Sequence, residues 1–261
     1  MFLYFLIFLC ILFLSFILSF CSREGMKDGQ DIPLNLFQTW NTSELPPKMK
    51  ECVQRLQKQN PEFNYFFYDD EACVEFIQKH FPPEVLDAFH RLIPGAYKAD
   101  LWRYCILYIR GGIYLDIKFE CCQGFRLLDL TYQPHYVMDR QKDPKTHAPY
   151  ASPGNILVYN GCMVSPPKNP VLKKCIDQIV ENVHKEEYGF NPLYPTGPGL
   201  LGEILGKSKY IDLTFSSDEK YIVYQNKNIL KKYPEYRKEQ TQTRPGNYYN
   251  DLWRKGNIYH P

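Results

Sequence analysis

Apolar and polar positions follow two different periodicities along residues 32–261, and these predict which segments form strands and which form helices. Short apolar or aromatic runs indicate strands, and they lie at 32–40, 63–68, 113–119, 136–139 and 156–159. Longer segments with apolar residues three and four apart indicate helices, and they lie at 49–59, 72–80, 83–91, 96–109, 170–183 and 200–205. Because strands and helices alternate, we expect an α/β domain with a mostly parallel sheet flanked by helices.

The beginning of the chain is almost entirely apolar. Residues Phe2–Phe20 form a run long enough to cross a bilayer as one helix, so we expect a transmembrane signal-anchor at 1–21 and a short polar stem at 22–31. A cleaved signal peptide is the competing interpretation, but no Lys or Arg precedes the apolar run. The charges after the run balance one another and do not fix its orientation. A glycosylation sequon at Asn41 would be used only if the domain faces a lumen.

The composition of the chain limits which kinds of molecule it is expected to bind. The chain has 31 basic and 29 acidic residues, so it lacks the excess of positive charge with which proteins bind nucleic acid. The locally basic stretch at 227–238 reads as a solvated helix or loop. Seven of the cysteines lie beyond the leader, and no C-x-x-C pair supports a zinc site. Because seven is an odd number, at least one of these thiols is expected to be free or paired with another chain.

Two carboxylates and a guanidinium are predicted to converge. Asp100 and Arg103 are three residues apart in a predicted helix and therefore share a face. The helix ends at Gly111-Gly112, and the strand that follows carries Asp116 near its exit. Ligands of open α/β sheets bind outside the carboxyl ends of the strands. Such groups suit the hydroxyls and the diphosphate of a sugar nucleotide, but a helix-surface ion pair and a plain turn explain the spacing equally well.

The stretch from Tyr97 to Asp116 closely resembles the DXD-containing sugar transferases related to the yeast initiating α-1,6-mannosyltransferase, of the glycosyltransferase family 32 type. Further blocks agree with this family in the same order, and they lie at 32–40, 60–70, 160–166, 196–198 and 248–253. The resemblance thus spans nearly all of residues 32–261.

This resemblance implies a GT-A fold with a Rossmann-like sheet over 32–261, a nucleotide-sugar donor, and a manganese-dependent transfer that retains configuration. By position, Asp100 and Arg103 would contact the donor sugar, and Asp116 would be the first Asp of the DXD motif. The donor-binding positions that it further implies are Gln38, Thr39, Trp40, Thr196 and Gly197.

One position departs from the motif. Lys118 stands where the second Asp is expected, and a protonated lysine cannot ligate a metal. Glu120 is expected to share a strand face with Asp116 and to supply the missing carboxylate, while Asn247 occupies the place of the family's metal-side histidine. The expected metal ligands are therefore Asp116, Glu120 and Asn247. In the alternative, Lys118 binds the donor and itself neutralises the diphosphate.

We therefore expect a glycosyltransferase of glycan biosynthesis that moves a hexose from GDP-mannose or a UDP-hexose to a glycan, glycolipid or glycoprotein. The resemblance and the leader together predict a single-pass type II membrane protein with its catalytic domain in a Golgi- or ER-like lumen. The alternative is a catalytically inactive GT-A-like protein that binds a sugar nucleotide or a glycan, and Lys118 motivates it.

Overall fold

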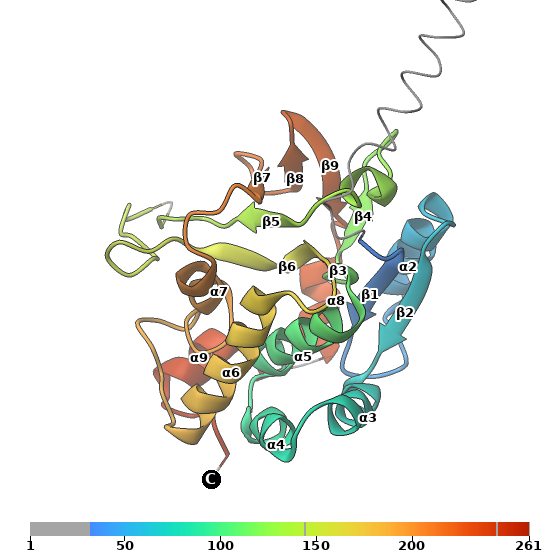
Figure 1. Cartoon of the computed structure of the whole chain (residues 1–261). Coiled ribbons are helices and arrows are strands. Elements are labelled where there is room, and N and C mark those ends of the chain that lie inside the picture. Colours follow the sequence, from blue (N-terminus) through green and yellow to red (C-terminus); the bar gives the residue numbers. More distant parts are fainter. Residues whose placement is uncertain (1–31, 144, 244, 261) are drawn as a thin grey trace, which may run out of the picture. The chain divides into compact units, whose positions relative to one another are not determined.

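The computed structural model describes residues 32–143, 145–243 and 245–260 (Figure 1). The expected signal-anchor at 1–21 and the stem at 22–31 lie outside these residues. Within the described ranges, no helix is long and apolar enough to cross a bilayer.

The elements of the first half follow the predicted pattern to within a few residues. They are β1 (Asn35–Thr39), α2 (Pro47–Gln59), β2 (Asn64–Tyr68), α3 (Asp70–His80), α4 (Pro83–Arg91) and α5 (Gly95–Arg110). Local chemistry explains their starts. Helices α2 and α4 begin with a proline, whose missing N–H costs nothing in the first turn. Asp69 caps α3 by accepting a hydrogen bond from the backbone N–H of Ala72.

The second half differs more from the prediction. The strand expected at 113–119 is divided into β3 (Gly112–Leu115) and β4 (Phe119–Cys121) by a turn at 116–118. The expected elements β5 (His135–Met138), α6 (Pro170–His184) and α7 (Pro198–Leu205) are present, while β6 (Val158–Ser165) overlaps the strand expected at 156–159 only at its first two residues. The stretch 227–238 was wrongly interpreted, because it begins with a strand, β9 (Lys227–Lys232). The elements that were not predicted are the 3-10 helix η1 (Leu127–Leu130), β7 (Ile211–Phe215), β8 (Tyr221–Tyr224), α8 (Tyr236–Thr243) and α9 (Tyr249–Arg254).

In the described part of the chain the strands form one nine-stranded sheet in the order β2-β1-β3-β6-β5-β7-β8-β9-β4. The pairs β1–β2, β1–β3 and β5–β7 are parallel, and the other five described pairs are antiparallel. The expectation of a mostly parallel sheet was therefore wrong. The reason is that β6 runs against both of its neighbours, and that β7, β8 and β9 follow one another through short turns, which only antiparallel strands permit.

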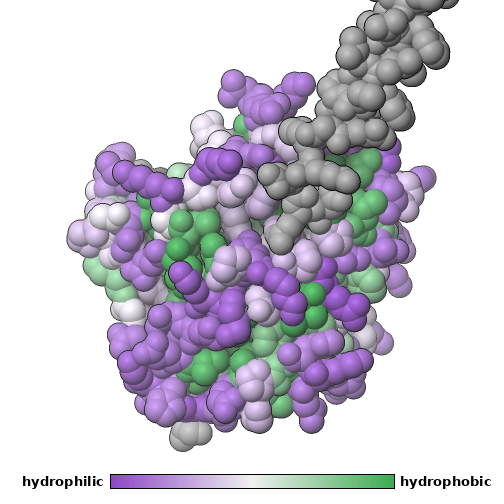
Figure 2. Space-filling view, viewed as in Figure 1, coloured by the Kyte–Doolittle hydropathy of each residue, from purple (hydrophilic) through white to green (hydrophobic). Residues whose placement is uncertain are grey.

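Side-chain alternation gives the sheet two apolar faces. Tyr114 and Met163 belong to the larger core, which also holds the buried residues of α3, α4, α5 and α6, and their chain neighbours Ile113 and Val164 belong to the core on the other face. Helix α5 packs against α6, β3 and β6 (Figure 1). On the face in view, Figure 2 shows mostly hydrophilic residues with apolar patches between them. Because α5 packs against another helix and the sheet, some of its polar side chains face the interior of the protein.

Candidate functional site

Helix α5 carries two of the expected site residues on its buried face. The helix begins after Pro94 and ends at Gly111, whose φ of 60° is one that glycine adopts without strain. Asp100 and Arg103 are 7% and 6% exposed, and Arg103 Nη1 lies 3.2 Å from Asp100 Oδ1. The alternative of a helix-surface ion pair was therefore wrong, because these residues face the sheet and not the solvent.

Asp116 follows β3 directly and joins this pair. Alternation along the strand places Tyr114 and Asp116 on the side that faces α5. The Arg103 guanidinium lies over the Tyr114 ring, 4.5 Å from its centroid, and Arg103 Nη2 lies 3.4 Å from Asp116 Oδ1. The Tyr114 hydroxyl donates a hydrogen bond to the same oxygen at 3.1 Å. Arg103 thus bridges a carboxylate of α5 and a carboxylate at the end of β3.

Asn160, on β6, holds the α5 pair in place. Its Oδ1 accepts a hydrogen bond from Arg103 Nη1 at 3.0 Å. Its Nδ2 donates to Asp100 Oδ1 and to the Tyr104 hydroxyl, each at 2.9 Å. Since Asn160 is 3% exposed, its full set of partners matters, because an unpaired buried amide would be costly. The network fixes the rotamers of both charged residues of α5.

The next residue, Gly161, allows β6 to approach Asp116. The Asp116 N–H donates to the Gly161 carbonyl at 2.7 Å, and the hydroxyl of Tyr159 donates to Asp116 Oδ2 at 2.5 Å. A Cβ at position 161 would lie 2.3 Å from Asp116 Oδ2 and 2.2 Å from the Tyr159 hydroxyl. Glycine is required here for space, since the side chains of Asp116 and Tyr159 fill the volume where a methyl group would be.

The loop before α7 completes the contacts of Asp100. The hydroxyl of Thr196, which is fully buried, donates to Asp100 Oδ2 at 2.7 Å. Gly197 is the N-cap residue of α7, and a Cβ there would lie 3.2 Å from the same oxygen. The structure therefore brings Thr196 and Gly197 beside Asp100.

The three expected donor-binding residues at the end of β1 and just after it have different partners. Gln38 is fully buried, and its Nε2 donates to the Asp116 carbonyl at 3.4 Å. The Thr39 hydroxyl instead donates to the carbonyl of Tyr68 on β2 at 2.8 Å. Trp40 packs in an apolar cluster that includes Ile117. Of the three, only Gln38 has a described hydrogen bond to Asp116.

The two carboxylates differ in their affinity for protons. Burial raises the pKa of Asp100, and the neighbouring Arg103 charge only partly opposes this effect. Burial also acts to raise the pKa of Asp116, but the charges of Lys118 and Arg103 outweigh it and hold that pKa below its usual value. Asp116 is therefore ionised at neutral pH and presents a fixed negative charge.

The contacts of the expected metal ligands do not fit a divalent cation. Lys118 Nζ lies 2.8 Å from Asp116 Oδ2, where it repels a metal ion. The turn at 116–118 breaks the strand, so the inference that Asp116 and Glu120 share a strand face was wrong. Glu120 is ion-paired with Arg55 and, at 3.3 Å, with Lys231.

Asn247, the third expected ligand, is also engaged elsewhere. It is exposed, and its Oδ1 accepts from the Gly95 N–H at 2.9 Å. Among the residues that the structure describes, no group of three or more His, Cys, Asp or Glu side chains is placed to hold a metal ion. Asp116, Glu120 and Asn247 thus have three separate sets of partners and do not form one ligand sphere.

Three tyrosines that contact the site residues were not predicted from the sequence as part of the site. Tyr114 is two residues before Asp116 on β3, Tyr104 is one turn after Asp100 on α5, and Tyr159 precedes the Asn160-Gly161 block. The spacing of the first two was a usable signal, because positions two apart in a strand and four apart in a helix share a face. Tyr159 gave no such signal, since only the pairing of β6 with β3 brings it to Asp116.

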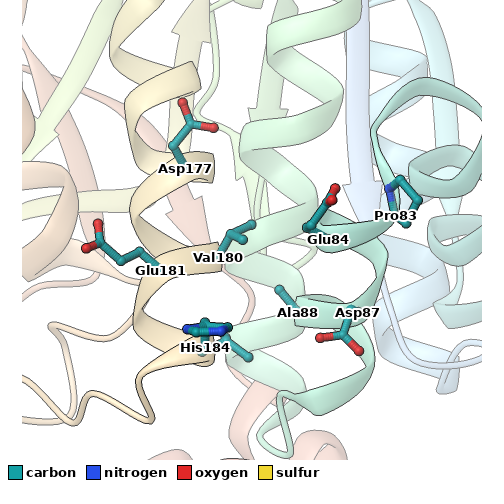
Figure 3. A pocket seen from close by; sticks show the side chains of 9 residues that line it. Pro83, Glu84, Asp87, Ala88, Asp177, Val180, Glu181 and His184 are labelled. Carbon is teal, nitrogen blue, oxygen red and sulfur yellow. The ribbon is translucent and has the colours of Figure 1, made fainter.

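An acidic groove of about 430 Å³ lies between α4 and α6. Glu84 and Asp87 of α4 and Asp177 and Glu181 of α6 line it (Figure 3). None of the expected site residues lines this groove, so it is separate from the network around Arg103.

The α/β fold of the described residues is similar to that of a solved glycosyltransferase. The solved structure of the PaToxG glycosyltransferase superposes with a TM-score of 0.51 at 20% identity, over 68% of this chain and 70% of that one. Residues 46–136 match the family described as the glycosyltransferase sugar-binding region containing DXD motif. Residues 46–136 thus match the DXD-containing sugar transferases, and the resemblance drawn from the motifs of the chain is confirmed.

The curated relatives include yeast enzymes whose names refer to inositol-containing ceramides. The mannosyl phosphorylinositol ceramide synthase SUR1 of Saccharomyces cerevisiae is 27% identical over 76% of this chain and 52% of its own length. The inositol phosphoceramide mannosyltransferase 2 of Schizosaccharomyces pombe is 32% identical over 58% of this chain and 39% of its own length. The chain thus spans about half the length or less of these relatives.

Proposed function

We propose that this chain transfers a hexose, with mannose the first candidate, from a nucleotide-sugar donor to a glycan or glycolipid acceptor. The observation that carries the proposal is the buried bridge of Arg103 between Asp100 and Asp116. In this proposal Asp100, Arg103 and Asp116 form the polar wall of the donor-sugar site, and Arg103 supports the fixed negative charge of Asp116. Gln38 lies at the nucleotide end, and Thr196 and Gly197 close the site beside Asp100.

The choice of mannose and of a lipid acceptor rests on the names of the relatives. SUR1 and the Schizosaccharomyces pombe enzyme are both named for mannosylation of an inositol-phosphate-bearing ceramide. An acceptor of this class, with sugar-like hydroxyls on a membrane lipid, also agrees with the anchor expected at 1–21. We further propose that transfer retains configuration and takes place in a Golgi- or ER-like lumen.

A donor panel tests the proposed activity. GDP-mannose, UDP-glucose and UDP-galactose are incubated with the protein, with and without inositol phosphoceramide, and the released nucleotide is measured. We expect one donor to be consumed, and Asp116→Asn to reduce turnover at least about 100-fold because a fixed charge at the donor is lost. Asp177→Asn, on the exposed side of α6, is the matched control. Unchanged turnover in Asp116→Asn would show that the site is wrongly assigned, and donor binding without turnover would favour a binding protein.

A further inference from the structure

We propose that Lys118 and Lys232 form a diphosphate-binding site that takes the place of the divalent cation of DXD transferases, so that the donor binds without metal. The inference rests on the proposed function, because the diphosphate is the part of a nucleotide sugar that a DXD-bound cation would otherwise neutralise. Four observations carry it. Both oxygens of Asp116 already accept hydrogen bonds, and aromatic rings surround the ammonium of Lys118. Lys232 lies on the strand next to Lys118, and Glu120 forms ion pairs with Arg55 and Lys231.

Both oxygens of Asp116 already have two donors each. Oδ1 accepts from the Tyr114 hydroxyl and faces Arg103 Nη2, at 3.1 and 3.4 Å. Oδ2 accepts from Lys118 Nζ at 2.8 Å and from the Tyr159 hydroxyl at 2.5 Å. A carboxylate offers about four lone-pair positions. A metal ion at Asp116 would therefore have to displace an ammonium or a hydroxyl.

Aromatic rings fix the position of the Lys118 ammonium. Its Nζ lies 5.4, 5.3 and 5.5 Å from the ring centroids of Phe119, Tyr159 and Tyr236. An ammonium has three hydrogens, and in the described part of the chain Lys118 donates only to Asp116. The side chain is 14% exposed, so the remaining N–H groups can reach a ligand at the site. Lys118 is thus a positioned cation with donors to spare.

Lys232 places a second ammonium beside the first. Strand β9 pairs with β4 so that Lys232 lies opposite Phe119, and the carbonyl of Lys118 accepts from the backbone N–H of Tyr233 at 3.0 Å. Lys232 Nζ lies 5.1 Å from the centroid of the Phe215 ring. Among the described residues, no carboxylate forms an ion pair with Lys232.

The electrostatics around Lys232 indicate repulsion that a bound anion would relieve. Burial, followed by the charges of Lys118 and Arg237, lowers the pKa of Lys232 to about 8, and the carboxylates of Asp116 and Asp139 only partly oppose this shift. Arg237 itself lies over the ring of Tyr236, 5.8 Å from the centroid. A diphosphate carries at least two negative charges and several acceptor oxygens, and lysine binds phosphate well as a compact point charge.

The first experiment measures the binding of GDP, UDP and inorganic pyrophosphate by calorimetry, in EDTA and in MnCl₂. We expect wild-type protein to bind a diphosphate with affinities that agree within about threefold between the two conditions. Lys118→Met and Lys232→Met should each weaken binding by about tenfold or more in both, while Lys118→Arg should keep most of it. Lys209→Met, which removes an exposed lysine that also lies over a tyrosine ring, is the matched control and should change nothing.

A second variant tests the exchange of lysine for metal directly. Lys118→Asp restores the second carboxylate of a DXD motif beside Asp116. We expect this variant to bind the diphosphate weakly in EDTA and at least about tenfold more tightly in MnCl₂. Thermal unfolding of each variant, recorded in parallel, shows whether the variant folds. The comparison of wild-type binding in EDTA and in MnCl₂ tests the proposal even if a variant does not fold.

The outcomes separate the two proposals. Wild-type binding that is lost in EDTA and restored by manganese overturns the metal-free site and leaves the proposed function standing. Metal-independent binding that neither lysine variant weakens also overturns it. If none of the diphosphates binds in either buffer, both the inference and the proposed function are wrong.

Discussion

At the scale of single residues, the site depends on shapes that few other side chains provide. Arg103 reaches Asp100, Asp116 and Asn160 at once because a guanidinium is flat and carries five donors. Lysine has one nitrogen and could not span the two carboxylates in this way. Gly161 is equally restricted, because the Asp116 carboxylate occupies the space beside it.

Gly161→Ala should reduce activity more than it reduces stability. The added methyl would have to displace the Asp116 carboxylate or the Tyr159 hydroxyl, and a shift of about 1 Å in such a group can lower turnover on the order of 100-fold. Overpacking of this kind costs about 1–3 kcal/mol in the free energy of unfolding. Turnover and urea denaturation of the variant measure the two effects.

Gly124→Ala is the matched control for this substitution. Gly124 has a φ of 79°, but no atom lies within 4 Å of the position that a Cβ would take, so alanine there strains the backbone and touches nothing. We expect it to lose stability and to keep turnover. If Gly161→Ala behaved in the same way, the close approach of β6 would have no functional role.

Lys232→Met should stabilise the fold at neutral pH. The pKa of Lys232 falls from 10.5 to about 8 because of burial and the charges of Lys118 and Arg237. The folded state therefore binds this proton less tightly than the unfolded state. The resulting penalty is fully present below pH 8, and it is relieved as the pH rises toward 10.5.

Urea denaturation at pH 7 and at pH 10 measures this effect. We expect Lys232→Met to be more stable than wild type by about 1–2 kcal/mol at pH 7, a figure that allows for solvent screening at a half-buried side chain. The difference should shrink by pH 10, where wild-type Lys232 is neutral in the fold. A difference that does not depend on pH would mean that packing, and not charge, accounts for it.

At the scale of elements, a residue far along the chain caps the start of α2. The N-cap position of α2 is Pro46, which has no side-chain cap. Glu239 of α8 fills this role, because its two carboxylate oxygens accept from the N–H groups of Lys48 and Met49, each at 2.9 Å. Its charge also lies at the positive end of the helix. Helices α2 and α8 are thus joined by one buried carboxylate.

Glu239→Ala should destabilise the protein by about 1–3 kcal/mol, because a buried and a part-buried N–H group lose their acceptor. Glu239→Gln keeps one acceptor oxygen and should lose less. Glu235→Ala, an exposed residue that precedes the same helix, is the control and should change the free energy of unfolding little. Equal effects at the two glutamates would contradict the capping role.

At the scale of the whole molecule, packing determines which thiols react. All seven described cysteines are free, and six of them are buried, with Cys122 the exception. Burial raises the pKa of these thiols, to about 12 for Cys52 and about 11 for Cys121. Because the thiolate is the reactive form, buried cysteines are protected both by access and by pKa.

Alkylation of the folded protein should therefore modify Cys122 first among these seven. Iodoacetamide at pH 8, followed by peptide mass spectrometry, gives the order of labelling. Cys122→Ser should remove the fast modification without changing the free energy of unfolding by more than about 0.5 kcal/mol. Labelling of Cys105 or Cys162 at a similar rate would show that the core opens more readily than this packing implies.

Much of the framework was determined by the sequence alone. Apolar residues three and four apart favour helices through local geometry, and the Pro, Asp and Gly residues at their ends fixed the bounds of α2 to α5 closely. The same local rules placed Asp100 and Arg103 on one face of α5 and Asp116 just beyond β3. The resemblance to the DXD-containing sugar transferases also followed from the motifs of the chain, because these motifs are local and ordered.

Only the tertiary structure decided which groups those residues meet. Strand direction depends on pairing between distant segments, so the mixed sheet and the entry of β6 beside β3 were not visible in local periodicity. Because of the turn at 116–118, Glu120 forms an ion pair with Arg55, and Lys118 forms one with Asp116. Charges interact through space and not along the chain, so the network around Arg103 and the pair of lysines beside it exist only in the folded molecule.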